Sequence, residues 1–127
     1  MQKNFFNNLK EEYFLEQAEE VSIPRLIGIE RETLRIDSSN YISTKEHPER
    51  LGSALLNKYI TTDFSEAMIE MITPPAETEY LSYSFLENIH HFTASKIGSE
   101  RLWPLSMPPV IRSEKDIRIA RYGTSNL

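Results

Sequence analysis

Alternation of hydrophobic and polar positions predicts two extended segments in this 127-residue chain, at residues 26–36 and 59–72. Both segments are rich in β-branched residues, which is typical of β-strands. The consecutive prolines at 74–75 end the second segment, because proline has no N–H to donate to a strand ladder. Residues 37–40 have the composition of a turn, and residues 41–44 are expected to form a short return strand.

Apolar residues at helical spacing predict a long helix over residues 77–96, which Gly98 is expected to end. The residues expected to form its buried stripe are Leu81, Phe85, Ile89 and Phe92. Three further elements are predicted: an amphipathic helix over residues 3–19, a short helix over 48–57 and an extended segment over 101–109 anchored by Trp103.

Acidic residues occupy alternate positions of both predicted strands. Glu30 and Glu32 are two residues apart, so both carboxylates leave the same face of a sheet. Glu66 and Glu70 are also an even number of residues apart and are expected to share a face, with Asp63 at the strand entrance. Converging carboxylates repel one another unless a cation lies among them. A hard divalent cation with oxygen ligands, Mg²⁺ bound with a nucleotide phosphate, is the simplest candidate.

A solvent-exposed strand face is the ordinary explanation of such acids, because the outer face of an antiparallel strand is polar. The neighbouring residues favour the cation instead. Glu30 and Glu32 share their face with Leu34, and Glu70 shares its face with Met68. A carboxylate on a partly apolar face loses hydration free energy unless it is paired or bound to a metal.

The composition, with 39% hydrophobic and 26% charged residues, is that of one folded domain. The net charge of −5 argues against a general nucleic-acid binder. The chain has no cysteine, which excludes disulfides, zinc thiolate sites and a cysteine nucleophile. His90 and His91 point about 100° apart on a helix, so a surface or helix-dipole role is expected rather than a metal pair. No signal peptide or membrane span is recognisable, and a cytoplasmic location is expected by default.

Five blocks of the sequence closely resemble the amino-terminal region of the proteobacterial-type glutamate–cysteine ligase family, in the same order and with similar spacing. The blocks are Gly28-Ile-Glu-Arg-Glu-Thr-Leu-Arg35, Ile60-Thr-Thr-Asp-Phe-Ser-Glu-Ala67, Glu70-Met-Ile-Thr-Pro74, Trp103-Pro-Leu-Ser-Met-Pro108 and Tyr122-Gly-Thr-Ser-Asn126. The resemblance implies an α+β fold that is part of a glutamine-synthetase-like architecture: a curved antiparallel sheet forming a funnel, with helices on the outside. It also implies that residues 1–127 are the amino-terminal portion of a single catalytic domain.

The resemblance assigns roles to residues of two of these blocks. It implies that the Mg²⁺ ligands, with Mn²⁺ as an alternative ion, are Glu30, Glu32, Asp63 and Glu70. It places Phe64 toward a cysteine-binding pocket, and we assign Glu66 a structural role or one beside the ligands.

The activity that the resemblance implies is the first step of glutathione synthesis, with ATP, L-glutamate and L-cysteine as substrates. The γ-carboxylate of glutamate attacks the γ-phosphate of ATP, and the amine of cysteine captures the resulting acyl phosphate. Mg²⁺ held by carboxylates neutralises the phosphate oxygens. Neither a nucleic-acid nor a membrane partner is expected.

Two departures from the family pattern stand out. Pro109 occupies a position where the family usually has a small or thiol residue, and the family chain is several times longer. The longer chain supplies a basic segment, a metal-binding histidine, a further glutamate and a catalytic arginine, so the chain is expected to be truncated and inactive by itself. Two alternatives stay open: a non-catalytic α+β module that binds a cation or a protein, and an inactive truncated fragment.

Overall fold

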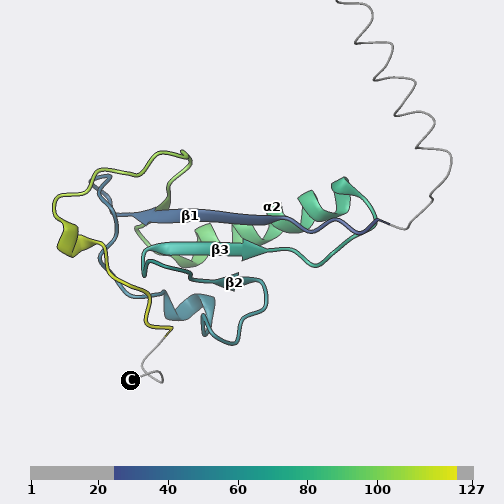
Figure 1. Cartoon of the computed structure of the whole chain (residues 1–127), viewed down its shortest axis with the longest axis horizontal. Helices are drawn as coiled ribbons and strands as arrows, with labels where there is room; N and C mark the ends of the chain where they lie inside the picture. Colours follow the sequence, from purple (N-terminus) through teal and green to yellow (C-terminus); the bar gives the residue numbers. More distant parts are fainter. Residues whose placement is uncertain (1–24, 123–127) are drawn as a thin grey trace, which may run out of the picture.

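The computed structural model describes residues 25–122. Its elements in chain order are β1 (Glu30–Ile36), the 3-10 helix η1 (Glu49–Leu51), β2 (Ile60–Thr61), β3 (Met68–Ile72), α2 (Glu79–Lys96), β4 (Arg101–Leu102) and the 3-10 helix η2 (Glu114–Asp116). The four strands form an antiparallel sheet in the order β2-β3-β1-β4, and α2 lies behind this sheet in Figure 1. The predicted α+β class is therefore confirmed. The predicted helix over residues 3–19 lies outside the described residues.

The longest strand pairing, between β1 and β3, runs from Glu30 opposite Ile72 to Leu34 opposite Met68. One face of this pair packs against α2. The core cluster there contains Leu51, Ile60, Ile69, Met71, Ile89 and Ile97, with Phe85, Leu86 and Leu102 packed against it. Because side chains alternate along a strand, burial of Ile69 and Met71 toward α2 leaves Glu70 on the opposite, open face.

Helix α2 begins two residues later than predicted, after Thr78, whose hydroxyl accepts a hydrogen bond from the Leu81 backbone N–H. It ends near Gly98, which has a φ of +68° and is the predicted stop.

The predicted buried stripe of α2 is partly wrong, because Leu81 and Phe92 are 52% and 45% exposed. Ser82 and Thr93 are buried instead. The Ser82 hydroxyl donates to the Ile27 carbonyl oxygen at 2.6 Å, and the Thr93 hydroxyl donates to the Ile89 carbonyl oxygen within the helix. Two small residues with hydrogen-bonded hydroxyls thus belong to the buried face of α2, whereas two of the four predicted apolar residues lie outside it.

The predicted strand over residues 59–72 is two strands separated by a loop, which we call the 62–67 loop. Residues 66 and 67 form a turn, and the Thr62 hydroxyl donates to the Ser65 carbonyl oxygen at 2.8 Å. Alternation along the chain stops at this turn.

Three other short predictions need correction. The expected strand at 41–44 forms only single bridges, from Ile42 to Ile36 and from Tyr41 to Val110. The helix expected over 48–57 is reduced to η1, which ends at Gly52 with a φ of +85°. In the segment 101–109 only β4 is extended and paired. Trp103 is half-buried, and its indole N–H donates to the Met107 carbonyl oxygen.

No helix within residues 25–122 combines the length and the apolar character that crossing a membrane requires.

Candidate metal centre

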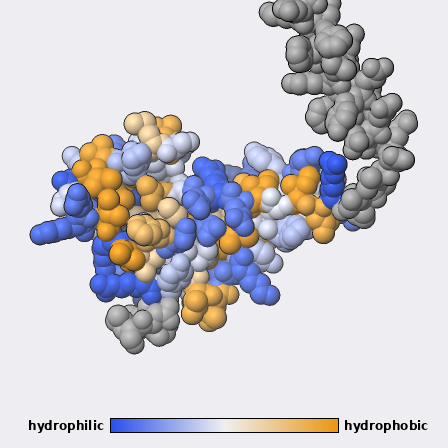
Figure 2. Space-filling view, in the orientation of Figure 1, coloured by the Kyte–Doolittle hydropathy of each residue, from blue (hydrophilic) through white to orange (hydrophobic). Residues whose placement is uncertain are grey.

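Three of the four predicted metal ligands lie on one face of the β1–β3 pair. Glu32 stands directly opposite Glu70, and Glu30 is two residues further along β1 on the same face. Directly opposed side chains of an antiparallel pair have Cβ atoms about 4.5–5.5 Å apart. This open side of the sheet faces the viewer in Figure 1, and in Figure 2 hydrophilic residues gather over its middle. We call this cluster, together with Asp63, the acidic face.

Asp63 reaches the acidic face from the 62–67 loop. The pKa of Glu70 is raised, first by partial burial and then by the negative charges of Glu30, Glu32 and Asp63. All four carboxylates therefore act on one region, which strand parity predicted for the three glutamates and the family resemblance predicted for Asp63. Glu70 is half-buried, whereas the other three side chains are exposed.

Within residues 25–122 no positive side chain forms an ion pair with the acidic face. The ion pairs among residues 25–122 join Arg35 to Glu100, Arg112 to Asp37 and Arg118 to Glu46, and none includes a member of the acidic face. On β1, Arg31 and Arg35 alternate with the two glutamates and so leave the other face of the strand.

The donor set of the acidic face suits a hard cation, because it consists of carboxylate oxygens alone. Within the described part of the chain, no group of three or more acidic or histidine side chains is already arranged to hold a metal ion. A bound cation would therefore have to draw the carboxylates of the acidic face inward from their present positions.

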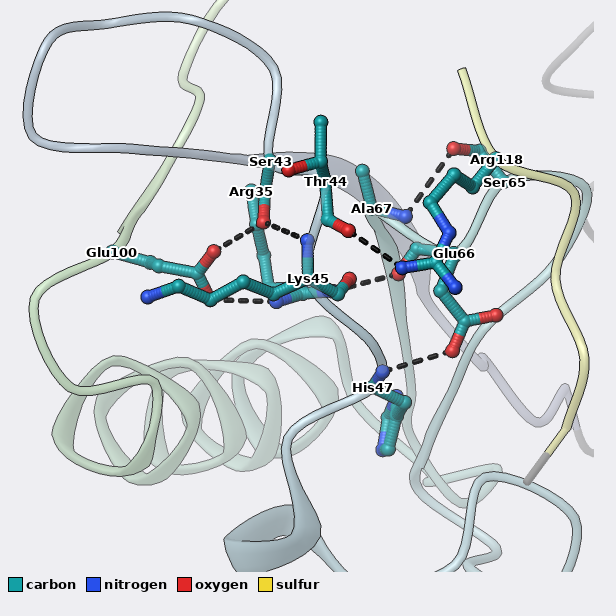
Figure 3. A network of polar contacts seen from close by, with 10 residues as sticks. All are labelled: Arg35, Ser43, Thr44, Lys45, His47, Ser65, Glu66, Ala67, Glu100 and Arg118. Atoms are coloured by element: carbon teal, nitrogen blue, oxygen red, sulfur yellow. Dashed lines mark hydrogen bonds and ion pairs between the residues drawn. The ribbon is translucent and has the colours of Figure 1, made fainter. Parts of the chain in front are cut away.

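Beneath the 62–67 loop lies a buried polar network that the sequence did not reveal (Figure 3). The side chain of Arg35 is fully buried, and its Nη1 lies 2.6 Å from Oε2 of Glu100. Glu100 also accepts a hydrogen bond from the Ser43 hydroxyl. The Nη2 atom of Arg35 donates to the carbonyl oxygens of Glu66, at 2.7 Å, and Lys45, at 2.9 Å. Arg35 thus joins β1 to two loops and to the residue that precedes β4.

Glu66 does not share the face of Glu70, which corrects the parity prediction. Glu66 is 3% exposed, and its carboxylate accepts hydrogen bonds from the backbone N–H groups of His47 and Arg121. The turn at residues 66 and 67 explains the difference, since alternation applies only within an unbroken strand. These contacts agree with the structural role assigned to Glu66.

Phe64 is 67% exposed on the same loop as Asp63. Most of the Phe64 side chain is therefore open to solvent, next in sequence to Asp63 of the acidic face.

Two histidines, His47 and His90, are half-buried and have lowered pKa values. Burial lowers the pKa of His47, with a further contribution from the positive charge of Arg35. Burial also lowers the pKa of His90, with contributions from Arg31 and His91. The ring centroids of His90 and His91 are 6.2 Å apart, and the two rings are nearly perpendicular. His91 is exposed, as the expected surface role requires, whereas His90 is half-buried.

Comparison with known proteins identifies relatives of this arrangement. The family model described as glutamate-cysteine ligase matches residues 12–127. The chain is 52% identical over 101 residues to a glutamate–cysteine ligase from Yersinia pseudotuberculosis, which covers 79% of this chain and 19% of the relative. It is 52% identical over 99 residues to the ligase of Vibrio parahaemolyticus, with 78% and 19% covered.

Solved structures of related enzymes are also similar to this chain. A glutamate–cysteine ligase from Francisella tularensis in complex with AMP superposes with a TM-score of 0.76 and 38% identity, covering 83% of this chain and 21% of that one. A bifunctional glutathione synthetase from Pasteurella multocida gives a TM-score of 0.73 and 33% identity, covering 77% and 14%. The chain spans about a fifth of the length of the curated relatives it matches. It belongs to the glutamate–cysteine ligase family.

Proposed function

We propose that the polypeptide in which this segment occurs joins the γ-carboxylate of L-glutamate to the amine of L-cysteine, at the expense of ATP and through γ-glutamyl phosphate. This is the first step of glutathione synthesis. Residues 1–127 are then the amino-terminal portion of its single catalytic domain. The observation that carries the proposal is the acidic face, in a chain that belongs to the glutamate–cysteine ligase family.

In this proposal Glu30, Glu32, Asp63 and Glu70 hold Mg²⁺, or Mn²⁺ in its place. The raised pKa of Glu70 supports the assignment, because its causes after partial burial are the negative charges of the other three carboxylates, which a divalent cation would neutralise. When bound, the ion neutralises phosphate oxygens and aligns the transferred phosphoryl group. The AMP in the Francisella structure supports a nucleotide as the co-substrate.

Phe64 is proposed to contact the cysteine substrate. Its support is its position next to Asp63, with a ring that is 67% exposed although phenylalanine is apolar. A cytoplasmic location and small-molecule substrates, with neither a nucleic-acid nor a membrane partner, complete the proposal. The formal charge of −5 agrees with the absence of a nucleic-acid partner.

The 127-residue segment alone is proposed to be inactive. Phosphoryl transfer needs cationic groups on the transferring phosphate in addition to metal ions. Arg31 and Arg35 lie on the opposite face of β1, and Arg35 is already occupied by Glu100. A site that lacks part of its wall loses the effective molarity on which ligation depends.

The test is phosphate release from ATP that depends on both glutamate and cysteine, measured in the full polypeptide and in the 127-residue segment. We expect activity in the first alone. Glu70→Gln should abolish it, whereas Glu87→Gln, the same change at an exposed position of α2, should leave it intact. Equal activity in the segment would contradict its proposed incompleteness, and no activity in either polypeptide would contradict the ligase function.

A cation-binding module without catalysis is the second candidate, because the acidic face by itself requires only a cation. It predicts that Mg²⁺ stabilises the full polypeptide while substrate-dependent phosphate release is absent.

A further inference from the structure

The Glu66 carboxylate is buried outside the acidic face, and both of its oxygens are used. Oε1 accepts from the His47 backbone N–H at 2.9 Å, and Oε2 accepts from the Arg121 backbone N–H at 2.7 Å. The two donors lie 19 and 55 residues away along the chain. Figure 3 shows the Glu66 side chain directed away from the Arg35–Glu100 pair and toward His47. A single carboxylate therefore ties two distant segments to one turn.

The main chain around Glu66 is held as well. Its N–H donates to the Arg118 carbonyl oxygen at 2.8 Å, and the Ala120 N–H donates to the Phe64 carbonyl oxygen at 3.0 Å. Ser65 and Ile119 form an antiparallel bridge between these two bonds. Residues 118–121 thus run beside residues 64–66 in the manner of an added strand, and the Glu66 carboxylate fixes the end of that strand.

Asp63 and Phe64 lie at the open end of the loop that these contacts hold. Both side chains are exposed, so their positions depend on the backbone beneath them rather than on packing around them. The carboxylate of Glu66 is the part of this anchor that a single side-chain substitution can change.

We propose that Glu66 is a positioning residue of the ligase: its buried carboxylate fixes the 62–67 loop so that Asp63 stays with the acidic face. This inference rests on the proposed function, because it takes the acidic face as the metal site. A carboxylate accepts at both oxygens, whereas a glutamine amide offers one accepting oxygen and an NH₂ group. In Glu66→Gln the amide NH₂ group would therefore face the backbone N–H of either His47 or Arg121, and two donors cannot form a hydrogen bond. One of the two contacts that hold the loop is then lost.

The experiment uses the full polypeptide in which the segment occurs. We expect Glu66→Gln to raise the Mg²⁺ concentration for half-maximal activity by about tenfold or more, with a smaller loss of kcat at saturating Mg²⁺. Hydrogen exchange of the backbone amides at 63–67 should also become faster. The matched control is Ser82→Ala, which removes a buried hydrogen bond between α2 and Ile27. It should lower the melting temperature without changing the Mg²⁺ requirement or the exchange at 63–67.

If Glu66→Gln behaves like Ser82→Ala in both readouts, Glu66 is merely a stabilising residue and the inference is overturned. If Glu66→Gln yields no folded protein, the pair Arg121→Pro and Arg121→Ala decides. Proline lacks the backbone N–H that donates to Glu66 Oε2, whereas alanine keeps this N–H. An equal Mg²⁺ requirement in the two variants would therefore overturn the inference. If the unmodified polypeptide shows no ligase activity, the proposed function fails, and the exchange comparison alone then decides whether Glu66 positions the loop.

Discussion

Glu32 and Glu70 face each other directly across the β1–β3 pair, with the carboxylate of Glu30 beside them. Two acids opposed in this way destabilise a sheet, because like charges at directly paired positions repel. The pKa of Glu70 is raised accordingly, by partial burial first and by its acidic neighbours second. This repulsion lowers the stability of the sheet, and a divalent ion bound as proposed would relieve it.

The first prediction is that Glu70→Gln changes stability in opposite directions with and without Mg²⁺. Without the ion, the substitution removes repulsion and should stabilise the fold by about 0.2–1 kcal/mol. With the ion, the native protein gains RT ln(1 + [Mg²⁺]/Kd), about 2.7 kcal/mol at a hundredfold excess over Kd, and the variant should lose most of this gain. Thermal melts of the full polypeptide at both conditions measure it, with Glu87→Gln as the control. A melt that Mg²⁺ does not shift would argue against a metal site.

The second prediction concerns pH in the absence of divalent ions. Because the pKa of Glu70 is raised in the folded state, the native protein holds this proton more tightly than the unfolded chain does. Stability from this group is therefore present at low pH and is lost as pH rises from the ordinary glutamate pKa through the raised folded value.

Urea midpoints measured across that interval should fall less steeply in Glu70→Gln than in the unmodified protein. Parallel curves for the two proteins would show that Glu70 titrates normally. Every other carboxylate is common to both proteins, so the difference between the curves reports Glu70 together with its charge interactions with the other acids of the acidic face.

Local alternation was enough to predict that Glu30, Glu32 and Glu70 share one face, whereas Asp63 was assigned only through the family resemblance. Residues 30–36 and 68–72 are unbroken strands, so the parity of Glu30, Glu32 and Glu70 gave their common face correctly. The same reasoning failed at Glu66, because a turn at residues 66 and 67 interrupts the alternation. Parity is informative only where the strand is continuous, and the sequence does not mark that turn with glycine or proline.

Contacts between residues far apart in the chain could not be predicted from the sequence, for a different reason. Arg35 and Glu100 are separated by 65 residues, and neither has a local pattern that indicates burial. The helix face was misjudged for a related reason. Apolar spacing favoured Leu81 and Phe92, yet Ser82 packs inward because its hydroxyl finds a buried acceptor at Ile27. The spacing of apolar residues does not indicate that a polar side chain will find a hydrogen-bond partner elsewhere in the chain.

The third prediction is that Arg35→Met is strongly destabilising. The substitution leaves Glu100, whose side chain is 4% exposed, as a buried charge without its partner. Breaking a buried pair in this way costs about 3–5 kcal/mol. The double variant Arg35→Met with Glu100→Gln should recover a large part of the loss, because it removes the stranded charge. Denaturant unfolding of the four proteins of this cycle gives the coupling, and additive losses would show that the pair is energetically independent.

The last prediction separates two glycines by backbone conformation. Gly98 follows α2 with a φ of +68°, and a Cβ placed there would meet no atom within 4 Å. Gly98→Ala should therefore cost about 1–2 kcal/mol through backbone strain alone, since L-residues are disfavoured in the left-handed region. Gly98→Asn should cost less, because asparagine tolerates that region.

Gly28 is the matched control. The atom nearest to a Cβ placed there is the Thr73 carbonyl oxygen at 3.8 Å, an ordinary van der Waals distance, and the φ of Gly28 lies outside the left-handed region. Gly28→Ala should accordingly leave the unfolding midpoint nearly unchanged, and equal losses at the two positions would mean that conformation at Gly98 is not what ends the helix.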